Sequence, residues 1–224
     1  MRKPVIAIDG YSSTGKSSIS KILAQRLGLI HMDTGALYRG VTYFALKCCT
    51  DAEGKIIFEQ LFSELKGISL EFRKTGDVLT LFLDGEDISQ PIRTKEVSDK
   101  VSEIACQKEV RAFLLDTQRA IAAHGGVILD GRDIGTVVLP DADYKFFLTA
   151  SIEERTKRRF LELQNMGVRM SEEEVRNNLT SRDRIDSERE IAPLRKAEDA
   201  ILIDNSNMTK AETIDAILSK ITLF

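Results

Sequence analysis

The stretch VIAIDGYSSTGKS, residues 5–17, decides the fold of this chain. Its first four residues are apolar, and residues 10–17 then match the pattern G-x-x-x-x-G-K-[ST] at every fixed position. Beyond Lys16, apolar residues recur at helical spacing as far as Gly28, a residue type common at helix ends. The sequence therefore predicts a strand, a glycine-rich loop and a helix in the order that phosphate-binding loops require.

The predicted loop is suited to the phosphates of a bound triphosphate. Successive backbone N–H groups converge on phosphate oxygens at a helix N-terminus, where the helix dipole favours negative charge. We expect Lys16 to reach the β- and γ-phosphates and Ser17 to place its hydroxyl on Mg²⁺, with Asp130 supporting the metal through water. The alternative is a Gly-Ser turn that binds nothing.

Four further apolar runs complete a set of five candidate strands: residues 29–32, 127–129, 144–148 and 201–203. Helical stretches separate most of them. Continuous apolar runs, in place of alternation, indicate strands that are buried on both faces, as in a parallel sheet with helices above and below. We therefore expect a doubly wound α/β fold.

The segment 66–93 has a different pattern. Ile68, Leu70 and Phe72 alternate with polar residues, and a turn signal, KTGD at 74–77, precedes the apolar run 78–83. This predicts an antiparallel hairpin. Because a hairpin does not belong in a series of parallel strands, we expect a small insertion at the rim of the core. A single helix is expected around residues 101–123.

Composition limits the class of protein. The chain has 224 residues, of which 42% are apolar and 30% charged, so we expect one core domain with inserted pieces and little disorder. No uninterrupted apolar run exceeds four residues, too short for a bilayer span or a secretory signal, and we expect a cytoplasmic protein. The net charge of −3 disfavours binding to DNA or RNA.

The cysteines and histidines show no motif. Cys48, Cys49 and Cys106 form no C-x-x-C pair and have no histidine cluster near them, so we expect reduced, core-filling thiols. His31 and His124 lack partners at motif spacing. For both we expect packing or surface exposure and no part in chemistry.

Arginines follow predicted strands or lie in the charge-mixed segment 153–196. The arginines of segment 153–196 suit a mobile flap that closes over a bound triphosphate with its guanidinium groups inward. For Arg155 and Arg184 the alternative is a solvated helix face with salt bridges between residues four apart. Arg132, within DGRD at 130–133, follows a predicted strand, where open α/β folds bind ligands.

Several segments, in this order, resemble bacterial cytidylate kinases. They are the loop at 10–17, DTGALYR at 33–39, DGRDIGT at 130–136 with PDA at 140–142, and RDR at 182–184 with PL at 193–194. The resemblance runs from residue 5 to residue 204. It implies a nucleoside monophosphate kinase that makes CDP and dCDP from CMP and dCMP with MgATP. The implied fold is a P-loop core with a five-stranded parallel sheet, an inserted antiparallel β-containing domain that binds the nucleoside monophosphate, and a helical lid.

The implied domain ranges are 1–60 (core with the phosphate loop), 61–97 (inserted nucleoside monophosphate-binding domain), 98–154 (core), 155–190 (lid) and 191–224 (core). The implied partners are small nucleotides, with Mg²⁺ as cofactor. We expect a monomer that binds neither nucleic acid nor a membrane.

The resemblance also implies residue roles. ATP would be bound by Gly10, Tyr11, Ser12, Ser13, Thr14, Gly15, Lys16, Ser17 and Ser18. The acceptor phosphate would be held by Thr34, Arg39, Arg132 and Arg189, the cytosine by Ser102, Arg111 and Asp133, and the ribose by Arg182 and Asp186. Catalytic roles fall to Lys16, Arg132, Arg158 and Arg189, and the lid arginines are Arg155, Arg158 and Arg159. For Ser102 and Arg111 the alternative is exposure on the predicted helix.

The chain departs from the family pattern at Tyr11, usually a proline, and at Ser13 and Thr14, often smaller residues. Tyr11 affects the rigidity of the loop and what packs over the phosphates, since the amide donors remain. The nearest rival function is a kinase for UMP, AMP or a hydroxylated metabolite. A nucleotide-switch protein is disfavoured, because no guanine-reading N-K-x-D motif occurs.

Overall fold

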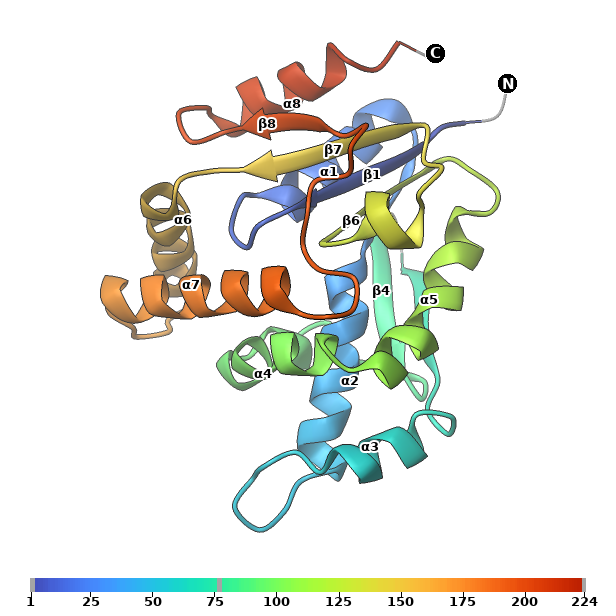
Figure 1. The fold of residues 1–224 in the computed structure, drawn as a ribbon, viewed down its shortest axis with the longest axis vertical. Coiled ribbons are helices and arrows are strands. Elements are labelled where there is room, and N and C mark those ends of the chain that lie inside the picture. Colours follow the sequence, from blue (N-terminus) through green and yellow to red (C-terminus); the bar gives the residue numbers. More distant parts are fainter. Residues whose placement is uncertain (1–2, 76–77, 223–224) are drawn as a thin grey trace. The chain divides into compact units, whose positions relative to one another are not determined.

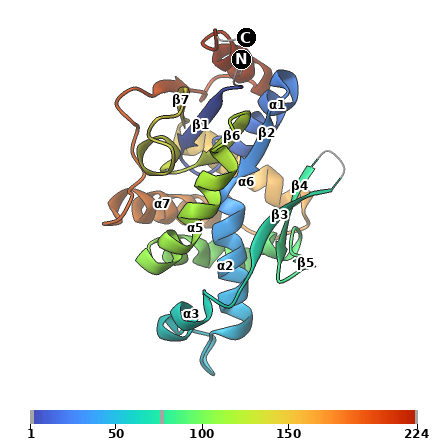
Figure 2. The same cartoon turned by 90° about the vertical axis from the view of Figure 1, so that its right-hand side faces the viewer.

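The structure, a computed structural model, describes residues 3–75 and 78–222. The chain divides into two compact units, a sheet unit (residues 1–32 and 121–224) and a middle unit (residues 33–120). Figure 1 and Figure 2 together label their helices and strands. No helix within the described ranges is long and apolar enough to cross a bilayer.

One five-stranded sheet organises the sheet unit, with the strand order β2-β6-β1-β7-β8. The strands are β1 (Val5–Gly10), β2 (Ile30–Asp33), β6 (Val127–Gly131), β7 (Tyr144–Thr149) and β8 (Ile201–Asp204). β1 pairs in parallel with β6 and β7, and β7 pairs in parallel with β8. The expected α/β fold and all five expected strands are confirmed.

Burial explains the apolar runs of β1 and β6. Every residue of β1 and β6 is buried, so neither strand can alternate apolar with polar side chains. On one face, Ile8 shares an apolar cluster with Leu23 of α1 (Lys16–Leu27) and Ile214 of α8 (Lys210–Leu218). Asp9, the next residue of β1, points to the other face, where it meets the short helical turn η2 (Ile134–Val138).

The register of the sheet brings the carboxyl ends of β1, β6 and β7 to the same side of the sheet. Ile8 lies beside Asp130 of β6 and beside Phe146 of β7. The glycine-rich loop starts where β1 ends, so it emerges next to the carboxyl end of β6. This side is where ligands bind in open parallel sheets.

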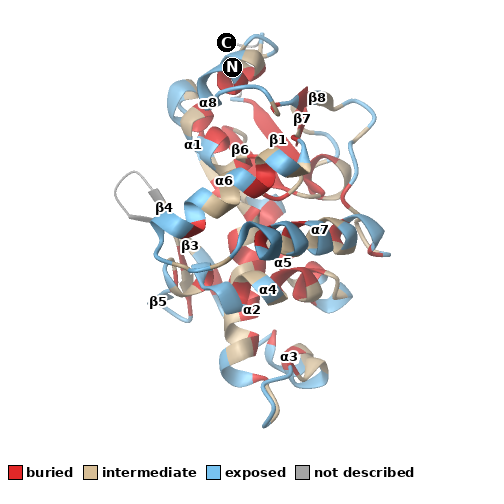
Figure 3. Ribbon diagram, turned by 90° about the vertical axis from the view of Figure 1, so that its left-hand side faces the viewer, coloured by how far each residue is buried: buried red, intermediate tan, exposed pale blue. Residues whose placement is uncertain are grey.

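The charge-mixed late segment forms two helices, α6 (Ile152–Asn165) and α7 (Glu172–Glu188). They pack through a small apolar cluster that contains Leu163, Val175 and Leu179. Each begins with a serine that accepts a backbone hydrogen bond, and Ser171 of α7 forms a full capping box with Glu174. Figure 3 shows exposed residues along both helices.

The middle unit combines helices with a small antiparallel sheet. Its elements are α2 (Thr34–Cys48), α3 (Phe58–Glu64), β3 (Leu70–Thr75), β4 (Val78–Leu83), β5 (Glu86–Asp87), the 3₁₀ turn η1 (Pro91–Arg93), α4 (Lys95–Ala105) and α5 (Lys108–Ala122). β4 pairs with both β3 and β5, which confirms the expected hairpin. The expected turn residues Gly76 and Asp77 lie outside the described residues.

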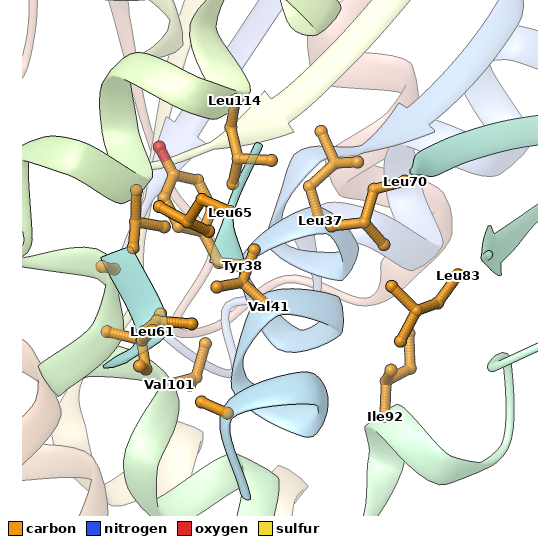
Figure 4. Close-up of a cluster of buried hydrophobic side chains, with 14 of the residues drawn as sticks. Leu37, Tyr38, Val41, Leu61, Leu65, Leu70, Leu83, Ile92, Val101 and Leu114 are labelled. Carbon is orange, nitrogen blue, oxygen red and sulfur yellow. The ribbon is translucent and has the colours of Figure 1, made fainter. Parts of the chain in front are cut away.

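Helix α2 is the centre of the middle unit, with the β3–β4 hairpin beside it (Figure 2). Val41 of α2 belongs to one apolar cluster with Leu61, Val101 and Leu114, drawn in Figure 4. Gly40 allows the close approach of the helix to the sheet, since a Cβ there would come within 2.9 Å of the Leu70 side chain.

Two expectations for the middle unit were wrong. The single helix expected around 101–123 is broken between α4 and α5, because the Arg111 Nη1 and Gln107 Nε2 groups donate to carbonyl oxygens of Ala105 and Glu103 at the end of α4. Cys48 is exposed at the end of α2 and fills no core, whereas Cys49 is buried.

Candidate active site

The backbone of the glycine-rich loop requires glycine at two positions, Gly10 and Gly15. Gly10 has φ +147°, and a Cβ there would lie 2.0 Å from the Leu148 carbonyl oxygen. Gly15 has φ +86° and precedes α1 without capping it through a side chain. The start of α1 thus has no side-chain cap, which suits the expected role of this helix end toward an anion.

Inside the loop, polar side chains converge on one carbonyl. Lys16 is buried, and its Nζ donates to the Tyr11 carbonyl oxygen at 2.7 Å. Thr14 Oγ1 donates to the same oxygen at 3.0 Å. Ser18 is exposed and bonds back to the Gly15 carbonyl oxygen. The ammonium group of Lys16 is therefore held within the turn of the loop where phosphates are expected.

Ser17 and Asp130, the two residues expected to support Mg²⁺, lie together. Ser17 Oγ donates to Asp130 Oδ2 at 2.6 Å, and the Asp130 side chain is only 3% exposed. His31 Nε2 lies 2.5 Å from the other oxygen, Asp130 Oδ1. His31 therefore has a hydrogen-bonding partner that spacing along the chain did not indicate, because the strand order places β2 beside β6.

Hydroxyl and carboxylate oxygens are ligands that Mg²⁺ prefers. Within the described ranges, no group of three or more His, Cys, Asp and Glu residues is arranged to hold a metal. A nucleotide-bound Mg²⁺ takes only one or two protein ligands and obtains the others from phosphates and water. Ser17 and Asp130 therefore fit that ion.

Asp9 anchors the loop that follows β6. Its two carboxylate oxygens accept hydrogen bonds from the N–H groups of Ile134 at 2.8 Å and Gly135 at 2.7 Å. Burial raises the pKa of Asp9 to about 7, although these two hydrogen bonds act in the opposite direction. The pairing holds η2, and with it the end of the DGRD segment, against β1.

Arginines and carboxylates of the sheet unit form a connected network. Arg132 donates to Asp186 Oδ2 at 3.0 Å and to Ser12 Oγ at 2.8 Å. Arg189 is almost fully buried and donates to Asp133 Oδ1 at 3.3 Å and to the Ala192 carbonyl oxygen at 2.8 Å. The network thus joins the phosphate loop, the loop after β6 and the end of α7.

The late arginines have different surroundings. Arg158 donates to the side-chain and backbone oxygens of Asn205, and Asn205 Nδ2 donates to the Thr14 carbonyl oxygen at 2.9 Å. Arg155 is buried against the phosphate loop, so a solvated position is wrong for it. Arg184 is exposed on α7, as in the alternative reading. Arg159 pairs with Glu162 at the surface, and Arg182 is half-buried.

The middle unit holds the other predicted residues. Arg39 pairs with Asp33 at 2.7 Å, and a Cβ at Gly35 would lie 3.0 Å from both side chains, so glycine leaves room for the pair. Ser102 and Arg111 are buried, which excludes the alternative that they are exposed on a helix. Thr34, the first residue of α2, is buried as well.

Sequence reasoning missed His31, Asp9, Asn205 and the partners of Arg155. Asp9 carried a weak signal, as an acidic residue between a buried strand and a phosphate loop. For His31 and Asn205 the sequence carries no such signal, because their partners, Asp130 and Thr14, are 99 and 191 residues away along the chain.

A family model described as cytidylate kinase matches residues 6–223 of the chain. A cytidylate kinase of Bacillus cereus (strain ATCC 10987 / NRS 248) is 43% identical over 214 residues, which cover 96% of this chain and 94% of that protein. One of Bacillus thuringiensis (strain Al Hakam) is 43% identical over 213 residues, 95% of this chain and 93% of that protein. A solved structure of an uncharacterized protein from Eubacterium ventriosum ATCC 27560 shares the fold, with a TM-score of 0.50, 14% identity and 97% of each chain covered.

Proposed function

The chain belongs to the cytidylate kinase family, and on this premise we propose that it transfers the γ-phosphate of ATP to CMP or dCMP, giving CDP or dCDP. The observation that carries the proposal is the 43% identity to cytidylate kinases over almost the whole chain. The phosphate loop agrees with it, since Lys16 and the uncapped start of α1 suit the triphosphate of a donor nucleotide.

We assign the donor to the loop from Gly10 to Ser18. Lys16 and the N–H groups at the start of α1 would bind its β- and γ-phosphates. Ser17 would hold Mg²⁺, with Asp130 supporting it through water. When bound, this ion neutralises charge on the β- and γ-phosphates.

In the sheet unit, we assign Arg132 and Arg189 to the acceptor phosphate, Asp133 to the cytosine, and Arg182 and Asp186 to the ribose. In the middle unit, the same family motifs assign Thr34 and Arg39 to the phosphate and Ser102 and Arg111 to the cytosine. The carboxylates that fix Arg132 and Arg189 support these roles, because a held guanidinium is already oriented when the nucleotide arrives.

The base selectivity follows from the hydrogen bonds of cytosine. Its ring N3 and O2 accept and its N4 amino group donates, whereas uracil has the opposite groups at N3 and position 4. A site that accepts from N4 would leave a buried acceptor without a partner against UMP. Unpaired buried polar groups make such discrimination steep.

In the reaction, an oxygen of the CMP phosphate attacks the γ-phosphorus of ATP in line. The new O–P bond forms as the bond between the γ-phosphorus and the bridging oxygen of ADP breaks. The second pKa of a phosphate monoester is about 6, so the acceptor is largely ionised at neutral pH and needs no strong general base. Lys16, Arg132, Arg158 and Arg189 would reduce the repulsion between the two anions.

The decisive experiment is a steady-state assay with MgATP and CMP, dCMP, UMP and AMP side by side. We expect the kcat/KM values for CMP and dCMP to exceed that for UMP by roughly 100-fold or more. A higher kcat/KM for UMP, AMP or a hydroxylated metabolite would overturn the assignment. A monomeric state and a cytoplasmic location remain predictions.

A further inference from the structure

His31 contacts the carboxylate that also contacts the serine of the phosphate loop. Its Nε2 lies 2.5 Å from Asp130 Oδ1, while Ser17 Oγ lies 2.6 Å from Oδ2. The two oxygens of one carboxylate thus face two different side chains. The three residues come from three neighbouring elements, since His31 is in β2, Asp130 in β6 and Ser17 in α1.

The direction of the two hydrogen bonds follows from the chemistry of the groups. An ionised carboxylate only accepts, so Ser17 Oγ and His31 Nε2 are the donors. Such a bond to an ionised acceptor is stronger than a neutral one, and Asp130 is almost completely shielded from water. The imidazole therefore limits rotation of the carboxylate about its last side-chain bond.

Packing alone does not require a histidine at this position. The His31 side chain is 17% exposed and lies between Ile30, which is exposed, and Met32, which is buried. An apolar residue would fill the same half-buried space. The close contact with a buried carboxylate is what distinguishes His31 from His124, which is exposed beyond the end of α5.

We propose that His31 is a positioning residue that orients the Asp130 carboxylate toward Mg²⁺ bound with the nucleotide at Ser17. The proposal rests on the proposed function, because it assumes that Ser17 and Asp130 support that ion. In this role His31 acts by holding Asp130 in one orientation. Residues that orient metal-supporting side chains in this way change metal affinity by about 10- to 100-fold when they are replaced.

The test measures binding and not turnover. Calorimetry gives the Kd of ATP in excess Mg²⁺ and in EDTA for the wild type, His31→Phe, His31→Gln and the matched control His124→Phe. The ratio of the two Kd values reports how much Mg²⁺ strengthens nucleotide binding. Phe keeps a planar ring without a donor, and Gln keeps an N–H donor. Thermal unfolding of each variant reports its folding.

We expect the ratio to fall by about 10- to 100-fold in His31→Phe, with the Kd in EDTA unchanged. His31→Gln should recover part of the ratio, and His124→Phe should equal the wild type. A wild-type ratio in His31→Phe overturns the proposal, and so does a parallel weakening in EDTA and in Mg²⁺. If the wild type itself binds ATP equally with and without Mg²⁺, the proposed metal site fails and the role of His31 fails with it.

Discussion

The guanidinium group of Arg155 lies over the ring of Tyr11, 5.2 Å from its centroid. The same group donates to the Ser12 and Ala150 carbonyl oxygens and to Asp183 Oδ2. The rings of Tyr11 and Phe147 pack in a T-shaped arrangement, with their centroids 5.8 Å apart and an interplanar angle of 89°. One buried arginine therefore connects the phosphate loop with both α6 and α7, and Tyr11 supplies the aromatic face on which it rests.

Replacing Tyr11 by Leu should loosen this connection. The change removes a cation–π contact and an edge-to-face aromatic contact, and we expect it to lower the free energy of unfolding by about 1–2 kcal/mol. Urea denaturation measures the effect. Tyr11→Phe is the control, since it keeps the ring and should remain within about 0.5 kcal/mol of the wild type. Equal losses in Leu and Phe would show that the hydroxyl, and not the ring, matters.

Gly10→Ala should prevent normal folding. The added methyl group would lie 2.0 Å from the Leu148 backbone oxygen, and the strand pairing leaves no room for it to move away. We expect a loss above about 4 kcal/mol, seen as insoluble or unfolded protein. Gly54→Ala is the matched control: its φ is also positive, but nothing lies within 4 Å, so only about 1–2 kcal/mol of backbone strain is expected. A stable, soluble Gly10→Ala protein would contradict the loop geometry.

The pKa of Asp9 predicts a pH dependence of stability. Burial raises this pKa from 3.8 to about 7, so between these values the folded state binds more protons than the unfolded state. The contribution of Asp9 to the free energy of unfolding is fully present below pH 3.8 and is lost as the pH rises to about 7. Melting temperatures across this range should therefore show the wild type losing stability with rising pH relative to Asp9→Asn. Parallel curves for the two proteins would refute the shift.

Asp9→Asn should also loosen the start of η2. The amide offers one acceptor where two backbone N–H groups now donate, so one of these buried donors loses its partner. Because these donors start η2, the loss should appear as faster hydrogen exchange at Ile134 and Gly135. Unchanged exchange there would contradict the anchoring role.

Lys16→Met should reduce turnover by orders of magnitude while the fold persists. Methionine keeps an unbranched apolar stem in this buried position but has no charge for the phosphates. Steady-state assays and thermal unfolding separate the two effects. The control is Lys21→Met, an exposed lysine on the same helix, which should behave as the wild type. Normal turnover in Lys16→Met would remove Lys16 from the mechanism.

Arg132→Lys tests the network next to the phosphate loop. A single ammonium cannot reproduce the fork that reaches Ser12 and Asp186 at once, and we expect kcat to fall by about 100- to 1,000-fold. The matched change Arg184→Lys, at an exposed arginine of α7, should leave kcat unchanged. If both variants retain full kcat, Arg132 takes no part in the transition state.

Local patterns determined the elements of the sheet unit. The apolar runs predicted all five strands, most directly β1 and β6, which are buried throughout and so have no polar side to encode. The spacing from Gly10 to Ser17 predicted a phosphate loop before α1. Helices α6 and α7 were harder to predict from the sequence. Few of their residues are buried, so apolar residues do not recur clearly at helical spacing among the charged ones. The break between α4 and α5 involves the side chains of Gln107 and Arg111, which donate to backbone carbonyl groups. The spacing of apolar residues carries no information about such hydrogen bonds.

The sequence by itself determined the phosphate loop, the parallel strands, the hairpin and the family resemblance, since each depends on residues close together in the chain or on motifs in a given order. Only the tertiary structure decided which distant side chains meet. His31 reaches Asp130 because β2 lies beside β6, and Arg155 reaches Tyr11 because α6 follows β7, the neighbour of β1. Strand order is set by the packing of the whole unit, so contacts that depend on it cannot be derived from spacing along the chain.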